Sequence, residues 1–160
     1  MPLLKNALLK KMPVGVDERI DPKIKLYATT EIDERIGKLF CFASMKLSDQ
    51  LEYEKMKDVP TCCCVFTDGE EITFTLKENQ FGAHLHFCWY PVEKWLKNDY
   101  SNTEIIKCIL EEFCHFYWNI EDEVEVCYKV LEIMKRIDDR LKLEDLYDDN
   151  NIEYRKQIKE

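Results

Sequence analysis

The sequence predicts an α+β fold: a small antiparallel β-meander with helices packed on one face and a long C-terminal antiparallel helix pair. Short apolar runs with alternating polarity fill the middle of the chain, and a helical apolar period replaces them after residue 91. The length of 160 residues and the 46% hydrophobic content are enough for a single core. We therefore predict one α+β domain over residues 1–148, followed by a frayed tail over 149–160 that begins in an Asp-Asp-Asn-Asn sequence.

The first third of the chain predicts mixed elements. A stripe of apolar residues beside lysines precedes Pro13, which is typical of a short helix, and the alternation of Ile24, Leu26 and Ala28 with polar residues is typical of a strand. Residues 31–58 fit both periods. The predicted elements are a helix over 2–12, a strand over 24–28, a helix over 31–37, a strand over 38–47 and a helix over 49–57.

The antiparallel meander depends on one turn signal. The dipeptide Asp68-Gly69 lies between the apolar runs 61–67 and 70–76. A two-residue type I′ turn needs positive φ at both positions, which Asp and Gly adopt more readily than other residues. The pattern therefore predicts a hairpin, and a third strand over 83–89 follows it.

Helical signals dominate residues 91–148. Pro91 suits the first turn of a short helix. Ser101 and Glu104 have the spacing of a capping box, and Asn119 can cap the next helix. The two helices after these caps carry continuous apolar faces, which predicts that they pack together as the C-terminal pair.

Charge and cysteine usage narrow the class of protein. A net charge of −9 argues against binding to nucleic-acid phosphates, because that affinity comes from Lys and Arg. Lysines interrupt the apolar runs at the start of the chain, so we expect neither a secretory signal nor a membrane span. Eight cysteines, three of them contiguous at 62–64, favour reduced thiols. We expect a cytoplasmic protein without membrane contact or direct nucleic-acid binding.

Two histidines form the most specific local pattern. His84 and His86 stand at positions i and i+2 of the predicted third strand, where two imidazoles could share one zinc ion. Cys88 continues that row, but the predicted meander places Cys62 and Cys64 two strands away, roughly 10 Å off. A third ligand is therefore missing. We predict no bound metal, with zinc at His84 and His86 as the alternative.

A second pattern covers residues 110–134. Glu111, Glu112 and His115, followed by an acid-rich helix, resemble the helix pair of zinc peptidases, in which H-E-x-x-H supplies two ligands and a general base. Glu112 and His115 match the general base and the second ligand. Glu111 stands where the first histidine ligand would be. The loss of that histidine would normally abolish the site. The resemblance therefore implies a degenerate zinc peptidase at most.

Acidic side chains gather around the junction of the two predicted C-terminal helices. The macrodipole favours the acids at the start of the second helix, whereas it disfavours Glu111 and Glu112 near the end of the first. We therefore regard those two as the stronger functional candidates. The candidate partner-binding residues are Glu111, Glu112, Glu121, Asp122, Glu123 and Glu125.

The functional prediction is protein–protein binding. The four glycines are isolated, so no phosphate-binding or dinucleotide-binding loop is present, and no pattern specifies a reaction. We expect a small acidic protein that is not an enzyme and that inhibits or neutralises a basic partner, such as a nucleic-acid-handling protein or a toxin. The alternatives are a metal-binding or degenerate zinc-peptidase-like protein using His84/His86 or Glu112/His115, and a structural subunit with an apolar oligomer interface.

Overall fold

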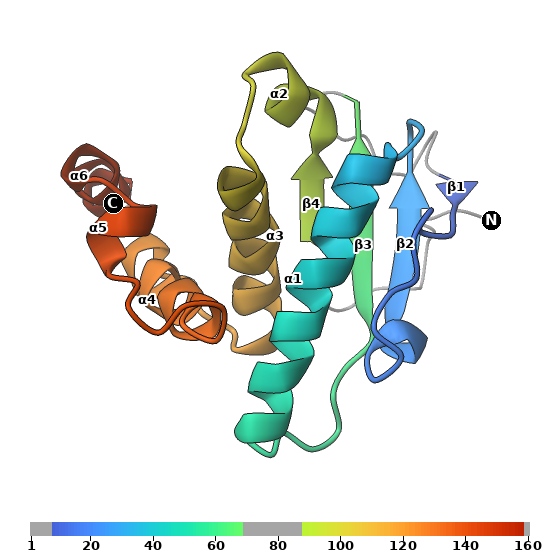
Figure 1. Ribbon diagram of the computed structural model, residues 1–160, viewed down its shortest axis with the longest axis horizontal. Helices are drawn as coiled ribbons and strands as arrows, with labels where there is room; N and C mark the ends of the chain where they lie inside the picture. Colours follow the sequence, from blue (N-terminus) through green and yellow to red (C-terminus); the bar gives the residue numbers. More distant parts are fainter. Residues whose placement is uncertain (1–7, 69–87, 159–160) are drawn as a thin grey trace, which may run out of the picture.

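The computed structural model describes residues 8–68 and 88–158, and it combines strands and helices as the sequence predicts (Figure 1). The strands are β1 (Leu8–Leu9), β2 (Ile24–Ala28), β3 (Cys62–Thr67) and β4 (Cys88–Pro91). The helices are α1 (Glu34–Tyr53), α2 (Val92–Lys97), α3 (Asn102–Tyr117), α4 (Glu123–Met134), α5 (Leu143–Leu146) and α6 (Asp149–Gln157), with a 3₁₀ helix, η1, at Asp21–Lys23.

The described strands form one sheet in the order β1-β2-β3-β4, and the predicted antiparallel meander is wrong. β2, β3 and β4 run parallel, and the two-residue β1 alone pairs antiparallel, beside β2. A parallel pair needs a crossover connection of a dozen or more residues, and α1 supplies it between β2 and β3. In this register Leu26 lies beside Cys64, and Cys64 lies beside Cys88.

α1 is one continuous helix where the sequence predicts a helix, a strand and a second helix. Its N-terminus is capped by Asp33, whose side chain accepts a hydrogen bond from the Ile36 backbone N–H at 3.0 Å. Ile36, Phe40 and Leu47 are fully buried at helical spacing. The apolar run 39–42 fits a buried strand as well as a helix when it is read alone, and packing along the sheet decides for the helix.

The predicted hairpin falls only partly within the described residues. The run 61–67 contains β3, whereas Gly69, the run 70–76, His84 and His86 lie outside them. β4 contains the end of the predicted third strand and is the direct parallel neighbour of β3. The helix predicted over 2–12 is wrong in its described part, where β1 forms instead.

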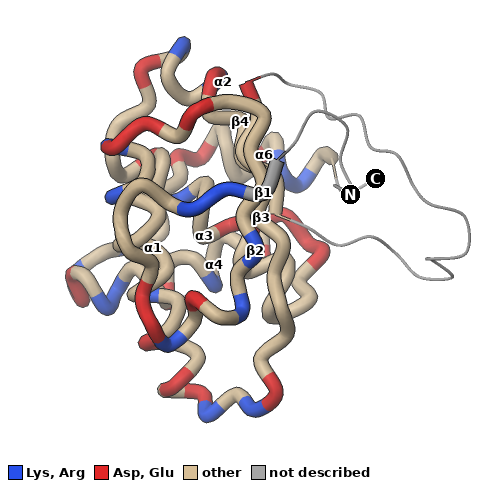
Figure 2. Tube along the Cα trace, turned by 90° about the vertical axis from the view of Figure 1, so that its right-hand side faces the viewer, with Lys and Arg blue, Asp and Glu red and all other residues tan. Residues whose placement is uncertain are grey.

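The core lies between α1 and α3 on one side and one face of the sheet on the other (Figures 1 and 2). Four fully buried rings meet there: Phe40 of α1, Phe66 of β3, Tyr90 of β4 and Phe113 of α3. The ring centroids of Phe40 lie 5.4 Å from Phe66 and 5.7 Å from Phe113, and those of Phe66 and Tyr90 are 5.0 Å apart. These aromatic contacts join both helices to the two strands.

The C-terminal helices lie beyond α3, on its side away from the sheet (Figure 1). α6 occupies most of the segment predicted to be a frayed tail. Asp148 explains this difference, because its side chain caps α6 by accepting a hydrogen bond from the Asn151 backbone N–H at 2.7 Å. Within the two described ranges, no helix is both long enough and apolar enough to cross a bilayer.

Candidate functional site

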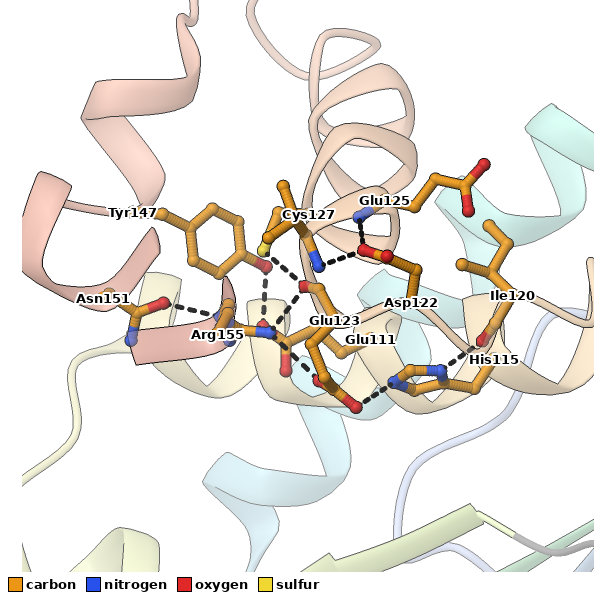
Figure 3. Close-up of polar contacts among 11 residues, drawn as sticks. Glu111, His115, Ile120, Asp122, Glu123, Glu125, Cys127, Tyr147, Asn151 and Arg155 are labelled. Atoms are coloured by element: carbon orange, nitrogen blue, oxygen red, sulfur yellow. Dashed lines mark hydrogen bonds and ion pairs between the residues drawn. The ribbon is translucent and has the colours of Figure 1, made fainter. Parts of the chain in front are cut away.

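The candidate site lies where α3, α4 and α6 meet (Figure 3). Ser101 caps α3 as predicted, since its side chain accepts a hydrogen bond from the Glu104 backbone N–H at 3.2 Å. The cap of α4 is Asp122 rather than the predicted Asn119; its side chain accepts from the backbone N–H groups of Val124 and Glu125. Asn119 instead has a positive φ of 53° in the turn between the helices. This turn brings α4 back against α3.

Arg155 of α6 binds two acids of this junction. Its guanidinium lies 2.8 Å from the carboxylate of Glu111 on α3 and 3.3 Å from that of Glu123 on α4. It also donates to the backbone carbonyl of Glu123 and to the side chain of Asn151. The Arg155 side chain is only 12% exposed, so these charge-assisted contacts are shielded from water. A single cation therefore joins three helices.

Tyr147 completes this polar network. Its hydroxyl donates to the Glu111 carboxylate at 2.7 Å, and its ring contacts the Arg155 guanidinium at 4.9 Å from the centroid. Lys107 lies 4.4 Å from the same ring centroid and donates to the backbone carbonyl of Leu146. Burial, followed by the negative charge of Glu111, raises the pKa of Tyr147, which keeps its phenol protonated as a donor.

The structure changes the interpretation of the two acids near the end of α3. Glu111 has internal partners, so the sequence-based argument that it lacks a structural role is wrong. Glu112 is half-buried, and burial, followed by the nearby Cys88, raises its pKa to about 8. At neutral pH the Glu112 carboxyl is therefore mainly neutral. Neither residue is a freely exposed carboxylate.

The residues that resemble a zinc-peptidase helix pair surround a guanidinium. Glu111, at the position of the missing first histidine, and Glu123, on the following helix, both bind Arg155 (Figure 3). His115 donates from Nδ1 to the backbone carbonyl of Ile120, and its Nε2 lies 3.6 Å from Glu123. Because Arg155 already occupies the space between the two acids and pairs with both, these residues do not fit a catalytic zinc ion.

An acidic hollow opens beside this network, between the α3–α4 turn and the end of α6. Its volume is about 880 Å³, and the described residues that line it include no Lys or Arg. Glu121 and Glu125 are exposed there, and Ile158 on the rim is 50% exposed. The lining residues are Trp118, Asn119, Ile120, Glu121, Asp122, Glu123, Glu125 and Ile158. Of the six predicted partner-binding acids, the hollow thus gathers four.

A different cluster lies in the core, where parallel pairing brings together three cysteines that the predicted meander separates. The Sγ atom of Cys62 lies 3.4 Å from that of Cys88 and 3.9 Å from that of Cys64. All three sulfurs lie within 4.8 Å of one another, and each residue is fully buried. The Cys-x-Cys spacing in β3 was a visible signal for two of these residues, but only strand order could add Cys88.

The three thiols of this cluster differ in acidity. Hydrogen bonds from Cys64 and Cys88 lower the pKa of Cys62 to about 5. Burial raises the pKa of both donors well above the ordinary thiol value. Cys62 is therefore the thiol of this cluster that releases a proton most readily.

Comparison of the chain with protein-family models, with curated proteins and with solved structures found no match. The functional argument therefore depends on the two clusters themselves. The predicted alternative ligands His84 and His86 lie outside the described residues, so they take no part in it.

Proposed function

We propose that this protein acts by binding a basic protein partner through the acidic hollow at the α3–α4 turn. The observation that carries this proposal is the charge of the hollow: four acids line it, and no described lining residue is a cation. Exposed surface charge of one sign attracts a partner of the opposite sign and accelerates association, and Glu121 and Glu125 are the two exposed acids here. Non-enzymatic action in the cytoplasm is part of the same proposal.

The acids of the junction divide between two roles. Glu111 and Glu123 hold Arg155 and thereby position α6, whereas Glu121 and Glu125 are exposed at the surface. Arg155 also serves as an internal example of the chemistry, since it shows a guanidinium bound by carboxylates from α3 and α4. We infer that Glu121 and Glu125 contact a Lys or Arg side chain of the partner.

Apolar side chains around the hollow favour a protein as the partner over a small cation. Tyr128 on α4 is 57% exposed beside Val124 and Glu125, and Ile158 is exposed at the other rim. Aromatic and apolar residues next to charges are typical of protein interfaces, where they supply the buried area that charge alone does not. The partner segment should therefore place a basic side chain next to an apolar one.

A charge-reversal experiment tests the proposal. The double variant Glu121→Lys, Glu125→Lys and the control Glu18→Lys, Glu93→Lys carry the same net charge, and all four glutamates are exposed. We expect a partner captured by the wild-type chain at low salt to be lost with the first variant and retained with the control. The association rate measured with that partner should fall with rising ionic strength for the wild type.

Two results would contradict the proposal. One is equal capture by the two double variants, which would mean that only net charge matters. The other is an association rate that does not change with ionic strength, which would remove electrostatic attraction from the mechanism. Circular dichroism of each variant shows whether the fold is intact before either result is interpreted.

A further inference from the structure

The buried thiol cluster has a chemistry that the acidic hollow does not use. Five of the eight cysteines are buried, but only Cys62, Cys64 and Cys88 converge on one point among the described residues. We propose that these three cysteines bind one thiophilic metal ion, Zn²⁺, in a structural site between the sheet and α3. This proposal is independent of the proposed protein partner.

The sulfur positions match the size of such an ion. Zinc–sulfur bonds of about 2.3 Å in a tetrahedral site place the sulfur atoms about 3.8 Å apart. The two shortest separations here are 3.4 Å and 3.9 Å, and the third is below 4.8 Å. Adjacent parallel strands produce this triangle directly, because Cys62 and Cys64 point to one face of β3 and Cys88 is the neighbour of Cys64 on β4. Small side-chain rotations suffice to bind the ion.

An unpaired hydroxyl beside the thiols is a second, independent observation. Tyr117 of α3 is 7% exposed, and its hydroxyl oxygen makes no hydrogen bond of good geometry among the described residues. The Cys62 side chain is the neighbour that this hydroxyl faces. A buried hydroxyl without a partner is unfavourable in a folded protein. A fourth position on the metal ion would satisfy the Tyr117 oxygen.

Charge favours zinc over a monovalent ion. Three thiolates around Zn²⁺ leave a net charge of −1, whereas the same thiolates around Cu⁺ leave −2 in a fully buried site. Soft thiolate ligands bind both ions, so the two must be distinguished by measurement. Binding displaces the remaining thiol protons to solvent, and its affinity therefore increases with pH.

Metal titration of the metal-free full-length chain tests the site. We expect one Zn²⁺ per chain, an increase in melting temperature, and a thiolate-to-metal charge-transfer band when Co²⁺ replaces Zn²⁺. The variant Cys64→Ser should lower the affinity for Zn²⁺ by more than about 100-fold, which exceeds the effect expected from an outer contact. The matched control is Cys114→Ser. Cys114 is also a fully buried thiol, but it does not belong to the group of three cysteines that could hold a metal ion.

Thiol alkylation of the wild-type chain gives a second test that needs no variant. In mild denaturant, Zn²⁺ should slow the alkylation of Cys62, Cys64 and Cys88 most. The alkylation of Cys114 and Cys127 should slow only as much as global unfolding does. Protection of Cys62, Cys64 and Cys88 that does not exceed the protection of Cys114 and Cys127 would overturn the assignment, because the rise in global stability alone would then explain it. Failure to bind Zn²⁺ would overturn it as well.

Two further measurements define the ion and its fourth ligand. Under anaerobic conditions, binding of one Cu⁺ by a chain that does not bind Zn²⁺ would overturn the choice of zinc. Tyr117→Phe should weaken Zn²⁺ binding about 10-fold or more while it stabilises the metal-free chain, because it removes the unpaired hydroxyl. Unchanged Zn²⁺ affinity in this variant would overturn the role of Tyr117 as a ligand.

Discussion

The packing of α3 on the sheet and the attachment of α6 depend on different forces. On the sheet side, fully buried aromatic rings from α1, β3, β4 and α3 pack against one another. On the other side, buried apolar residues of α4 and α5 belong to the same core. α6 differs, because it has no buried residue among those described and is held by the ionic and hydrogen-bonded contacts of Arg155 and by the partly buried Ile152. Salt and pH act on ionic contacts far more than on apolar packing. α6 can therefore loosen under conditions that leave the core intact.

The largest expected effect is in the aromatic core. Phe40→Ala removes a fully buried ring that contacts Phe66, Tyr90 and Phe113, and it should lower the free energy of unfolding by about 3–5 kcal/mol. Urea denaturation should give the same loss at low and high salt. The control is Tyr53→Ala, since Tyr53 is 70% exposed and should contribute little. A loss below about 1 kcal/mol for Phe40→Ala would contradict the packing described here.

Arg155→Ala is the corresponding test on the other side of α3. The change leaves Glu111 and Glu123 without their shared cation, and it should cost about 2–3 kcal/mol, less than for a fully buried pair. Hydrogen exchange should accelerate in α5 and α6 but not in α1. Arg140→Ala is the control, because Arg140 is 86% exposed in its pair with Asp138.

Deletion of residues 150–160 sharpens the same comparison. A frayed tail would be removable without effect, whereas the structure places Arg155 within the deleted segment. The truncated chain should lose at least as much stability as Arg155→Ala. Equal melting temperatures for the truncated and full-length chains would show that α6 contributes nothing to the fold.

Glu112 gives the smallest expected effect and the clearest dependence on pH. Its pKa, raised to about 8 by burial, lies above the ordinary value of 4.5. The folded chain therefore retains a proton that the unfolded chain releases, and stability falls as the pH rises from 4.5 to 8. Because Glu112 is only half-buried, water screens much of the several kcal/mol that this shift would represent in a dry site. Glu112→Gln should therefore leave stability unchanged near pH 4 and raise it by about 1–2 kcal/mol at pH 8.

The neighbouring acid provides the control for this prediction. Glu111→Gln should lower stability at neutral pH, because it weakens the pair with Arg155. The two substitutions thus have opposite signs although the residues are adjacent in the sequence. The same sign for both, measured by thermal unfolding at several pH values, would contradict the different environments of these two carboxyl groups.

Local patterns predicted the helices of the second half better than the arrangement of the strands. The start of α3 follows from its capping residues, and the structure confirms the Ser101 cap. Several residues before α4 can cap a helix. The sequence predicts Asn119 as the cap, and the structure has Asp122 in that role. The sequence wrongly predicts a strand within α1, because the run 39–42 is apolar at every position and fits the period of a helix as well as that of a strand.

In the candidate sites, too, local patterns were predictable from the sequence and contacts between distant segments were not. The acids of the junction could be found from the sequence, but their separation into partners of Arg155 and exposed groups could not, because Arg155 is 44 residues from Glu111 along the chain. The thiol cluster was missed for a related reason. The predicted hairpin places Cys62 and Cys88 two strands apart, whereas in the structure their strands are direct neighbours.

By itself, the sequence determined the acidic charge, the coexistence of helices and strands, the N-terminal cap of α3 and the thiol pair Cys62-x-Cys64. These properties depend on composition or on residues a few positions apart, where hydrogen bonding and side-chain period act locally. Only the tertiary structure decided the parallel order of the strands, the attachment of α6 through Arg155 and the meeting of Cys62 with Cys88. Each of these joins segments far apart in the chain, and the free energy that selects them comes from packing and charge pairing that no local pattern contains.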